Sequence, residues 1–159
     1  MRLLFLVLLG LMIGNEAKAE ESHNYLVMGH VPNPSQTAFV DSSSIKKHGS
    51  RVTYWTVWIY GTPRKFSSAT VSYFARKNTD DCLENLNNQV EAVAYDSNGK
   101  QLTVDGYGAT AAVRVVPKSV GEAMHNFVCF GKIPFDVPQT TIRTIEEARQ
   151  GAQLMEAFQ

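Results

Sequence analysis

Cysteine and histidine are the residue types in this sequence with the widest range of chemistry. The chain has two cysteines, Cys82 and Cys129. In an oxidising compartment we expect these two thiols to form one disulfide. Closing a loop of roughly 48 residues stabilises a fold by about 4 kcal/mol in the chain-entropy model. Because disulfide-bonded cysteines cannot bind zinc, we expect this pair to be structural.

The remaining candidate residues do not form a catalytic or metal-binding pattern. The histidines are not at ligand spacing, so we expect surface or hydrogen-bonded roles for His23, His30, His48 and His125. Asp80 and Asp81 are adjacent, and adjacent residues of a strand point to opposite sides, so a turn or strand-end cap is favoured over a carboxylate pair. Motifs for an activated serine, a phosphate loop or a Cys-His nucleophile do not occur. We therefore predict a protein that is not an enzyme and has no cofactor.

The N-terminus has the pattern of a cleaved signal peptide. A basic start is followed by an apolar run from Leu3 to Ile13 and by small residues at Ala17 and Ala19. We predict a signal peptide over residues 1–19, because the run is too short to span about 30 Å of hydrocarbon. No cysteine lies at the cleavage point for lipidation. We therefore expect a periplasmic or secreted protein without stable membrane insertion.

The charge balance excludes one class of partner. Lysine plus arginine and aspartate plus glutamate each number 15, so the formal net charge is zero. Such a chain lacks the basic footprint of a nucleic-acid-binding protein. The roughly 140 residues that follow the signal peptide suit a single domain over residues 20–159.

Alternating and β-branched segments predict a β-sheet. Breakers at Val31–Ser35 separate the first two segments, and Asp41–Ile45 is expected to be a turn or a single helical turn. A hairpin is expected across Asn98-Gly99. The predicted strands are Asn24–Gly29, Ala38–Val40, Arg51–Tyr60, Ser67–Arg76, Val90–Tyr95, Gln101–Val104 and Ala109–Val116.

Two capping-box patterns predict helices. Ser119 and Glu122 open one helix, whose apolar stripe predicts an end near Val128. Thr144 and Glu147 open a C-terminal helix of about 141–158, whose apolar stripe is thin, so we expect it to be loosely held or partner-dependent. The predicted fold class is α+β: an antiparallel sheet of about five to six strands with a helix packed on one face, one disulfide and a C-terminal helix.

The strand Arg51–Tyr60 carries apolar side chains on both faces, which indicates a central position in the sheet. We predict that Trp55 packs under the first helix, at Met124 or Phe127. The other face then remains for self-association or partner capture, with Trp58 as its anchor. The predicted partner-binding residues are Tyr54, Trp58 and Tyr60. The alternative is that all these aromatic side chains belong to the core.

Several of these segments together resemble one known family. Phe39–Ile45, Val52–Trp58, Asp81-Cys82 and the run from Val116 to Cys129 look like the bacterial surface-adhesin E family, over roughly Tyr25–Cys129. The resemblance implies an antiparallel sheet with a helix on one side, tied by the disulfide, in a Gram-negative cell envelope. The prototype is a lipoprotein that binds host extracellular-matrix and plasma proteins and can dimerise, whereas this chain has no lipidation cysteine.

Two functional classes follow from these observations. The first is a non-enzymatic secreted or envelope binding protein, adhesin-like, that recognises a protein partner such as a host matrix or plasma protein through one sheet face, with a homodimer as a further possibility. The alternative is a periplasmic inhibitor or immunity-type protein that blocks a specific enzyme. A sheet tied by a disulfide serves either function, so the fold does not decide between them.

Overall fold

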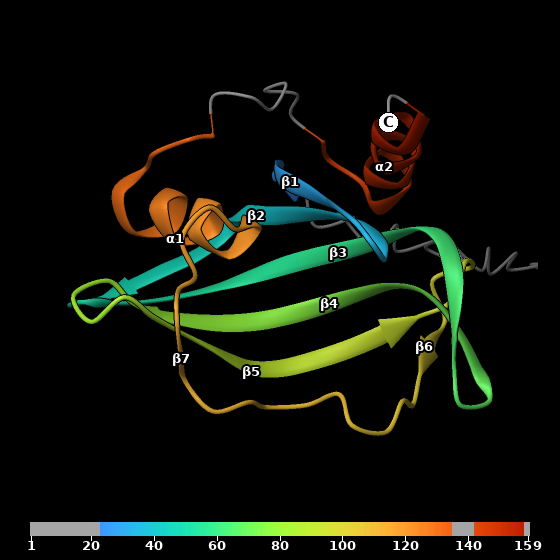
Figure 1. Cartoon of the computed structure of the whole chain (residues 1–159), viewed down its shortest axis with the longest axis horizontal. Helices are drawn as coiled ribbons and strands as arrows, with labels where there is room; N and C mark the ends of the chain where they lie inside the picture. Colours follow the sequence, from blue (N-terminus) through green and yellow to red (C-terminus); the bar gives the residue numbers. More distant parts are fainter. Residues whose placement is uncertain (1–22, 135–141, 158–159) are drawn as a thin grey trace, which may run out of the picture.

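The computed structural model of the chain describes residues 23–134 and 142–157. A long, twisted antiparallel sheet forms the centre of the molecule, and two helices lie over different ends of it (Figure 1). The helices are α1 (Val120–Phe130) and α2 (Ile145–Ala157). The predicted signal peptide, residues 1–19, lies outside the described residues.

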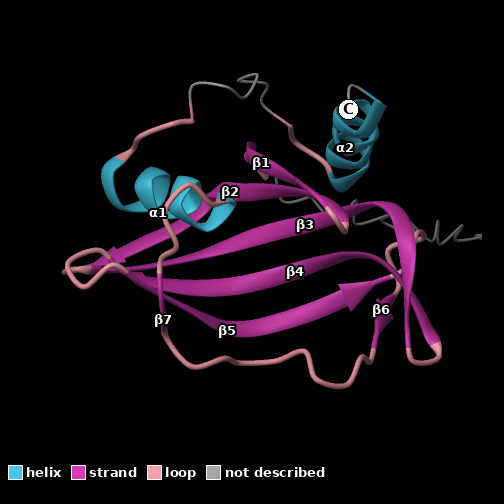
Figure 2. Ribbon diagram, viewed as in Figure 1, coloured by secondary structure: helices cyan, strands magenta, loops and turns pink. Residues whose placement is uncertain are grey.

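The sheet has seven strands in the order β1-β2-β3-β4-β5-β6, with β7 paired to β5, and all pairings are antiparallel (Figure 2). This arrangement confirms the predicted fold class. The strands are β1 (Tyr25–Pro32), β2 (Ser35–His48), β3 (Arg51–Phe66), β4 (Ala69–Asp81), β5 (Leu86–Tyr95), β6 (Gln101–Leu102) and β7 (Val113–Arg114).

The second strand is longer than its sequence predicts. Asp41–Ile45 is neither a turn nor a helical turn but an irregularity within β2, where the pairing with β3 shifts between Asp41 and Lys46. Side chains replace the interrupted ladder here: the Trp55 amide donates to Ser44 Oγ at 2.8 Å. Serine competes well for backbone groups, which explains how the chain continues as a strand through a turn-like sequence.

Several further boundaries differ from the predictions; β3 ends at Phe66 rather than Tyr60, for example, and β4 at Asp81 rather than Arg76. The predicted strand Ala109–Val116 is reduced to Val113–Arg114. Helix α1 runs to Phe130, two residues beyond the predicted end, and Gly131 stops it at a φ of 69° with its N–H donating to Phe127 O. Cys129 therefore lies within the last turn of α1 rather than after it.

The first capping box is confirmed at the start of α1. Ser119 Oγ accepts the Glu122 amide at 3.1 Å, and Glu122 reaches back to the Lys118 amide at 2.7 Å. Glycine allows the helix to lie close to β1, because a Cβ on Gly29 would come within 2.9 Å of Val120 Cγ2. The φ of Gly29, 156°, is also one that other residues rarely adopt.

Each helix covers one face of β3. Helix α1 places Met124 and Val128 against Val52 and Tyr54. Helix α2 places Ala148 and Ala152 against the opposite face, in a cluster that contains Phe39, Val57 and Ile59. Both alanines are at most 1 % exposed, so α2 packs closely on the core instead of being loosely held.

The prediction that Trp55 packs under α1 is wrong. Alternation along β3 correctly separates Trp55, Val57 and Ile59 from their neighbours, but that face receives α2 and not α1. Period-2 patterning states which side chains share a face. It does not state which helix covers that face.

The predicted disulfide is present. Cys82 follows the end of β4 and Cys129 lies in the last turn of α1, with their Cα atoms 5.6 Å apart. The Cys82 amide donates to Ser50 O at 2.9 Å, which holds this end of β4 beside the turn between β2 and β3. The bond therefore fixes the C-terminal end of α1 to one end of the sheet.

Removing the disulfide should lower stability substantially. For a sequence separation of 47 residues, we expect the double variant Cys82→Ala/Cys129→Ala to lose about 4 kcal/mol of unfolding free energy in the chain-entropy model. Urea denaturation of both proteins checks this value. If the double variant had the same denaturation midpoint as the wild type, the disulfide would not stabilise the fold by restricting the unfolded chain, contrary to this prediction.

Candidate functional site

An open groove of about 890 Å³ lies on the α2 side of the sheet. Its floor includes Trp55 of β3 and Lys77 of β4, which are direct partners in the antiparallel register. Lys46 and His48 of β2 line it at one side, and Ile145 of α2 lines it where the helix begins. We call this surface the Trp55 groove.

Two lysines and one carboxylate supply the formal charges of the Trp55 groove. Lys46 and His48 are exposed, and Lys77 is partly exposed. Asp41 is the one carboxylate among the described lining residues, and its oxygens already accept hydrogen bonds from His23 Nδ1 at 2.7 Å and from Ser43. The lysines are therefore more available to a bound partner than the Asp41 carboxylate is.

Two stacked tyrosines form another part of the lining. The rings of Tyr73 and Tyr95 are parallel to within 9°, with centroids 4.7 Å apart. Burial, together with the smaller effect of the neighbouring Tyr95, raises the pKa of Tyr73 to about 12. Tyr73 is thus a neutral hydrogen-bonding phenol at any physiological pH.

The Asp41 carboxylate is stabilised in its ionised form. Burial raises its pKa, but the hydrogen bonds from Ser43, His23 and Asn24 outweigh that effect and lower the pKa below its ordinary value of 3.8. These bonds connect the start of β1 to the irregular part of β2.

This pKa shift predicts an acid-sensitive contribution to stability. A carboxyl whose pKa is lower in the folded chain stabilises the fold above its unfolded pKa, and the contribution is lost as pH falls through the folded pKa. We expect the stability difference between wild type and Asp41→Asn to be full above about pH 5 and to shrink steadily below about pH 4. Denaturation of both proteins from pH 2 to pH 7 measures it. A difference that does not vary with pH would contradict this assignment.

The three predicted partner-binding residues lie on the opposite face of β3, and that face is largely covered. Tyr54 is 1 % exposed and Tyr60 is 6 % exposed, whereas Trp58 is partly exposed. Tyr54 lies under α1, and Tyr60 contacts a cluster that includes Phe74. The expectation of an open face is therefore wrong for both tyrosines, and binding through Trp58 stays a prediction.

The chain between β6 and α1 supplies the cover that sequence analysis did not anticipate. It runs outside β5 on its way to α1 (Figure 1). Tyr107 from this segment stacks on Phe74 with centroids 4.3 Å apart, and the Thr110 amide donates to Gln89 O at 2.8 Å. An irregular segment of this kind leaves no periodic signal in the sequence.

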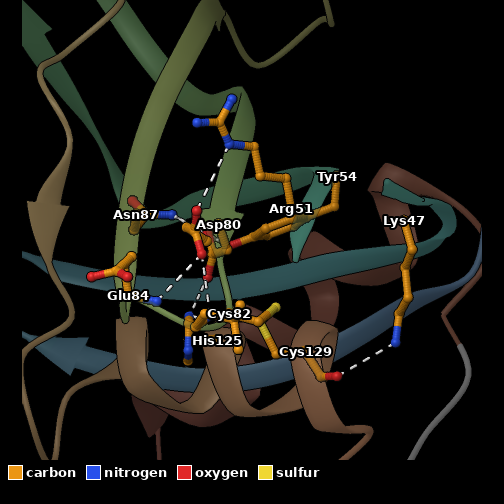
Figure 3. The surroundings of a disulfide bond; sticks show 11 residues. Lys47, Arg51, Tyr54, Asp80, Cys82, Glu84, Asn87, His125 and Cys129 are labelled. Atoms are coloured by element: carbon orange, nitrogen blue, oxygen red, sulfur yellow. Dashed lines mark hydrogen bonds and ion pairs between the residues drawn. A yellow bond between two sulfur atoms is a disulfide. The ribbon is translucent and has the colours of Figure 1, made fainter. Parts of the chain in front are cut away.

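A buried hydrogen-bond cluster joins the covered face to the disulfide (Figure 3). Asp80 is fully buried and accepts three side-chain hydrogen bonds. The donors are Tyr54 Oη at 3.0 Å, Asn87 Nδ2 at 2.6 Å and His125 Nδ1 at 2.7 Å. Since a carboxylate only accepts, this geometry places the His125 proton on Nδ1.

The cluster holds a set of potential metal ligands whose atoms are already committed. Asp80, His125 and Cys129 bring ligand atoms within 4.8 Å of one another. However, Cys129 is bonded to Cys82, and His125 donates to Asp80. The arrangement therefore acts as a polar anchor for α1. Sequence reasoning missed it because Asp80 and His125 are 45 residues apart.

Removing one donor from this anchor should destabilise the fold. Tyr54→Phe keeps the ring in place under α1 but removes the hydroxyl that donates to buried Asp80. We expect a loss of about 1–3 kcal/mol, the cost of an unsatisfied buried polar group. Tyr95→Phe is the control, because among the described residues its hydroxyl has no hydrogen-bond partner. Thermal and urea denaturation of both variants should show the loss for Tyr54→Phe alone.

The fold and the groove define a class: a small α+β domain with one helix on each face of an antiparallel sheet, tied by one disulfide. The family model of surface-adhesin protein E matches residues 25–130, which is more than half of the chain. The chain therefore belongs to the surface-adhesin protein E family. Membership makes it an adhesin-like surface protein and favours a binding role over catalysis.

Solved structures agree at the level of the fold. Crystal form II of Haemophilus influenzae protein E matches with a TM-score of 0.51 and 15 % identity, over 60 % of this chain and 83 % of that chain. The selenomethionine form of the same protein matches with a TM-score of 0.50 and 14 % identity, over 65 % and 84 % of the two chains. No curated protein sequence matches this chain. Neither described helix has the length and apolarity that a membrane crossing requires.

Proposed function

We propose that this chain is an envelope or secreted binding protein that recognises a protein partner through the Trp55 groove. The observation that carries the proposal is a partly exposed tryptophan at the centre of the sheet, paired with Lys77 of β4, in a groove that Lys46 of β2 also lines. Tryptophan is the side chain most enriched among residues that dominate binding energy. Its ring buries a large area and orders few rotatable bonds.

The groove is also rigid enough to serve as a recognition surface. Trp55 lies on β3, which is hydrogen-bonded to β2 and β4, and its amide is held by Ser44. Binding to a surface that is already ordered avoids the entropy of arranging it. An apolar centre with a polar rim is the usual anatomy of a protein interface.

The charges of the groove favour an acidic partner segment. Lys46 and Lys77 line the groove, while Asp41 is occupied by internal hydrogen bonds. Complementary charge accelerates association and selects among partners. We therefore propose that the groove binds an apolar and acidic segment of a host matrix or plasma protein, which is the partner class that the family suggests.

Trp55→Ala should weaken partner binding while the fold remains intact. We expect at least a tenfold loss of affinity for any purified matrix or plasma protein that binds the wild type, because a central aromatic anchor is worth about 2 kcal/mol or more. Lys77→Ala should slow association and reduce its dependence on salt. Biolayer interferometry at two salt concentrations measures both effects.

The matched controls lie away from the groove. Leu83→Ala removes an apolar side chain that is 78 % exposed, and Lys100→Ala removes an exposed lysine from a hairpin turn. Both should bind as the wild type does. If Trp55→Ala binds normally, or if a folded wild type binds none of the proteins in the panel, the proposal fails. Loss of a concentration-dependent dimer in sedimentation of Trp55→Ala would instead identify a second copy of this chain as the occupant.

A further inference from the structure

We propose a second binding site, on the α1 side of the sheet, in which Arg76 binds a carboxylate. A pocket of about 180 Å³ lies there between α1 and the segment that covers β5. Its lining residues include Arg76 and Asn78 of β4, Gln89 of β5, Trp58 of β3 and Thr110. Arg76 and Lys77 are adjacent in β4 and point to opposite faces, so this pocket is separate from the Trp55 groove.

Arg76 differs from Arg51 and Arg149, the arginines of the described chain that form ion pairs. Arg51 lies 3.8 Å from Asp81, and Arg149 lies 3.3 Å from Glu146. Arg76 has no ion pair with any described residue. Its Nε is buried without a hydrogen-bond partner among those residues. Arg76 as a whole is partly exposed, so it is the Nε side of its guanidinium that is withdrawn from water. A charged donor withdrawn from water normally has an acceptor beside it, because leaving it unpaired is costly.

Aromatic rings hold the guanidinium but do not neutralise it. Arg76 Cζ lies 5.0 Å from the centre of the Trp58 ring and 5.5 Å from that of Phe74. Cation–π contacts of this kind orient the planar group. Burial still lowers the pKa of Arg76 below its ordinary value. Because Nε has no hydrogen-bond partner among the described residues, the Nε edge of the guanidinium is the one that an acid would occupy through two parallel N–H···O bonds.

Further donors lie in the same pocket. Gln89 Nε2 donates one hydrogen to Gly108 O and keeps a second. Thr110 Oγ1 accepts a hydrogen bond from the backbone N–H of Gln89, so the hydroxyl hydrogen of Thr110 is available for a ligand as well. Each of the two carboxylate oxygens could therefore accept bonds from Arg76 and from one neutral donor.

The size and charge of the pocket restrict the ligand to a small monoanion. A volume of 180 Å³ corresponds to roughly six water molecules at about 30 Å³ each, so it suits a short acid rather than a drug-sized ligand. One guanidinium balances one negative charge, whereas phosphate carries more charge and is not planar. The carboxylate could come from a free short-chain acid or from an aspartate or glutamate side chain of a partner.

The two tryptophans give a direct readout of this site. The indole N–H signals of Trp55 and Trp58 can be assigned with Trp→Phe variants and followed by NMR during titration with sodium acetate, against sodium chloride at equal ionic strength. We expect a saturable shift of the Trp58 signal alone. A shift that does not saturate, or that chloride reproduces, would overturn the proposal.

Variants of Arg76 provide the decisive comparison. Arg76→Met keeps the apolar stem of the side chain and should weaken acetate binding at least tenfold without lowering the melting temperature, because the Nε that it removes has no hydrogen-bond partner among the described residues. Arg76→Lys should also weaken it, since an ammonium cannot form the planar pair. The matched control is Arg64→Met, which removes an exposed arginine that lies over Tyr60. Unchanged acetate binding by a folded Arg76→Met would refute the site.

Adding a negative charge to the pocket tests the proposal in a second way, which does not depend on whether the Arg76 variants fold. Gln89→Glu places a carboxylate in the pocket itself, so we expect it to compete with acetate and weaken acetate binding, although it also loses the hydrogen bond from Gln89 Nε2 to Gly108 O. A short peptide carrying aspartate that binds more tightly than acetate would identify a partner side chain as the source, and the reverse order would identify a free acid. Tighter binding of inorganic phosphate than of acetate would overturn the assignment to a carboxylate.

Discussion

Apolar side chains on both faces of β3 are the constraint from which the rest of this fold follows. Val52 and Tyr54 point to one side, while Val57 and Ile59 point to the other, and all four are nearly inaccessible to solvent. A strand of this kind is stable only when both of its faces are covered. A short chain has few elements with which to do this. Each of the two described helices therefore covers one face, and each leaves part of that face to other segments.

The two helices are attached by different physical means. Small residues let α2 approach the sheet closely, as the complete burial of Ala148 shows. Helix α1 is attached by a hydrogen bond and a covalent bond in addition to its apolar contacts, since His125 donates to Asp80 in the sheet and Cys129, one turn later, is bonded to Cys82. Both bonds act on the same turn of α1. Covalent and hydrogen-bonded attachment are thus concentrated at one end of the sheet, and the Trp55 groove lies on the opposite face.

Local sequence patterns predicted the features of this structure that depend on interactions between residues close together in the chain. Capping boxes located both helix starts, alternation located β3 and β4, and the cysteine count predicted the disulfide. Contacts between residues far apart in the chain could not be predicted from such patterns. The pattern that grouped Trp55 with Ile59 did not identify α2 as their cover, and nothing near Asp80 in the sequence announces His125. The serines after Asp41 misled for a related reason, because their side chains can complete either a turn or an interrupted strand.

Incomplete cover on both faces of one sheet underlies both of the binding sites that we propose. Alternation along β4 sends Lys77 to the groove and Arg76 to the pocket, although they are neighbours in the chain. Lys77 lines an open groove, where a charge attracts partners over a distance but contributes little affinity by itself. Arg76 lies against the rings of Trp58 and Phe74 with its Nε withdrawn from water, so an anion bound there would interact through fewer screening waters. In these two proposals the degree of cover, rather than the residue type, decides whether a cation on this sheet serves encounter or specific recognition.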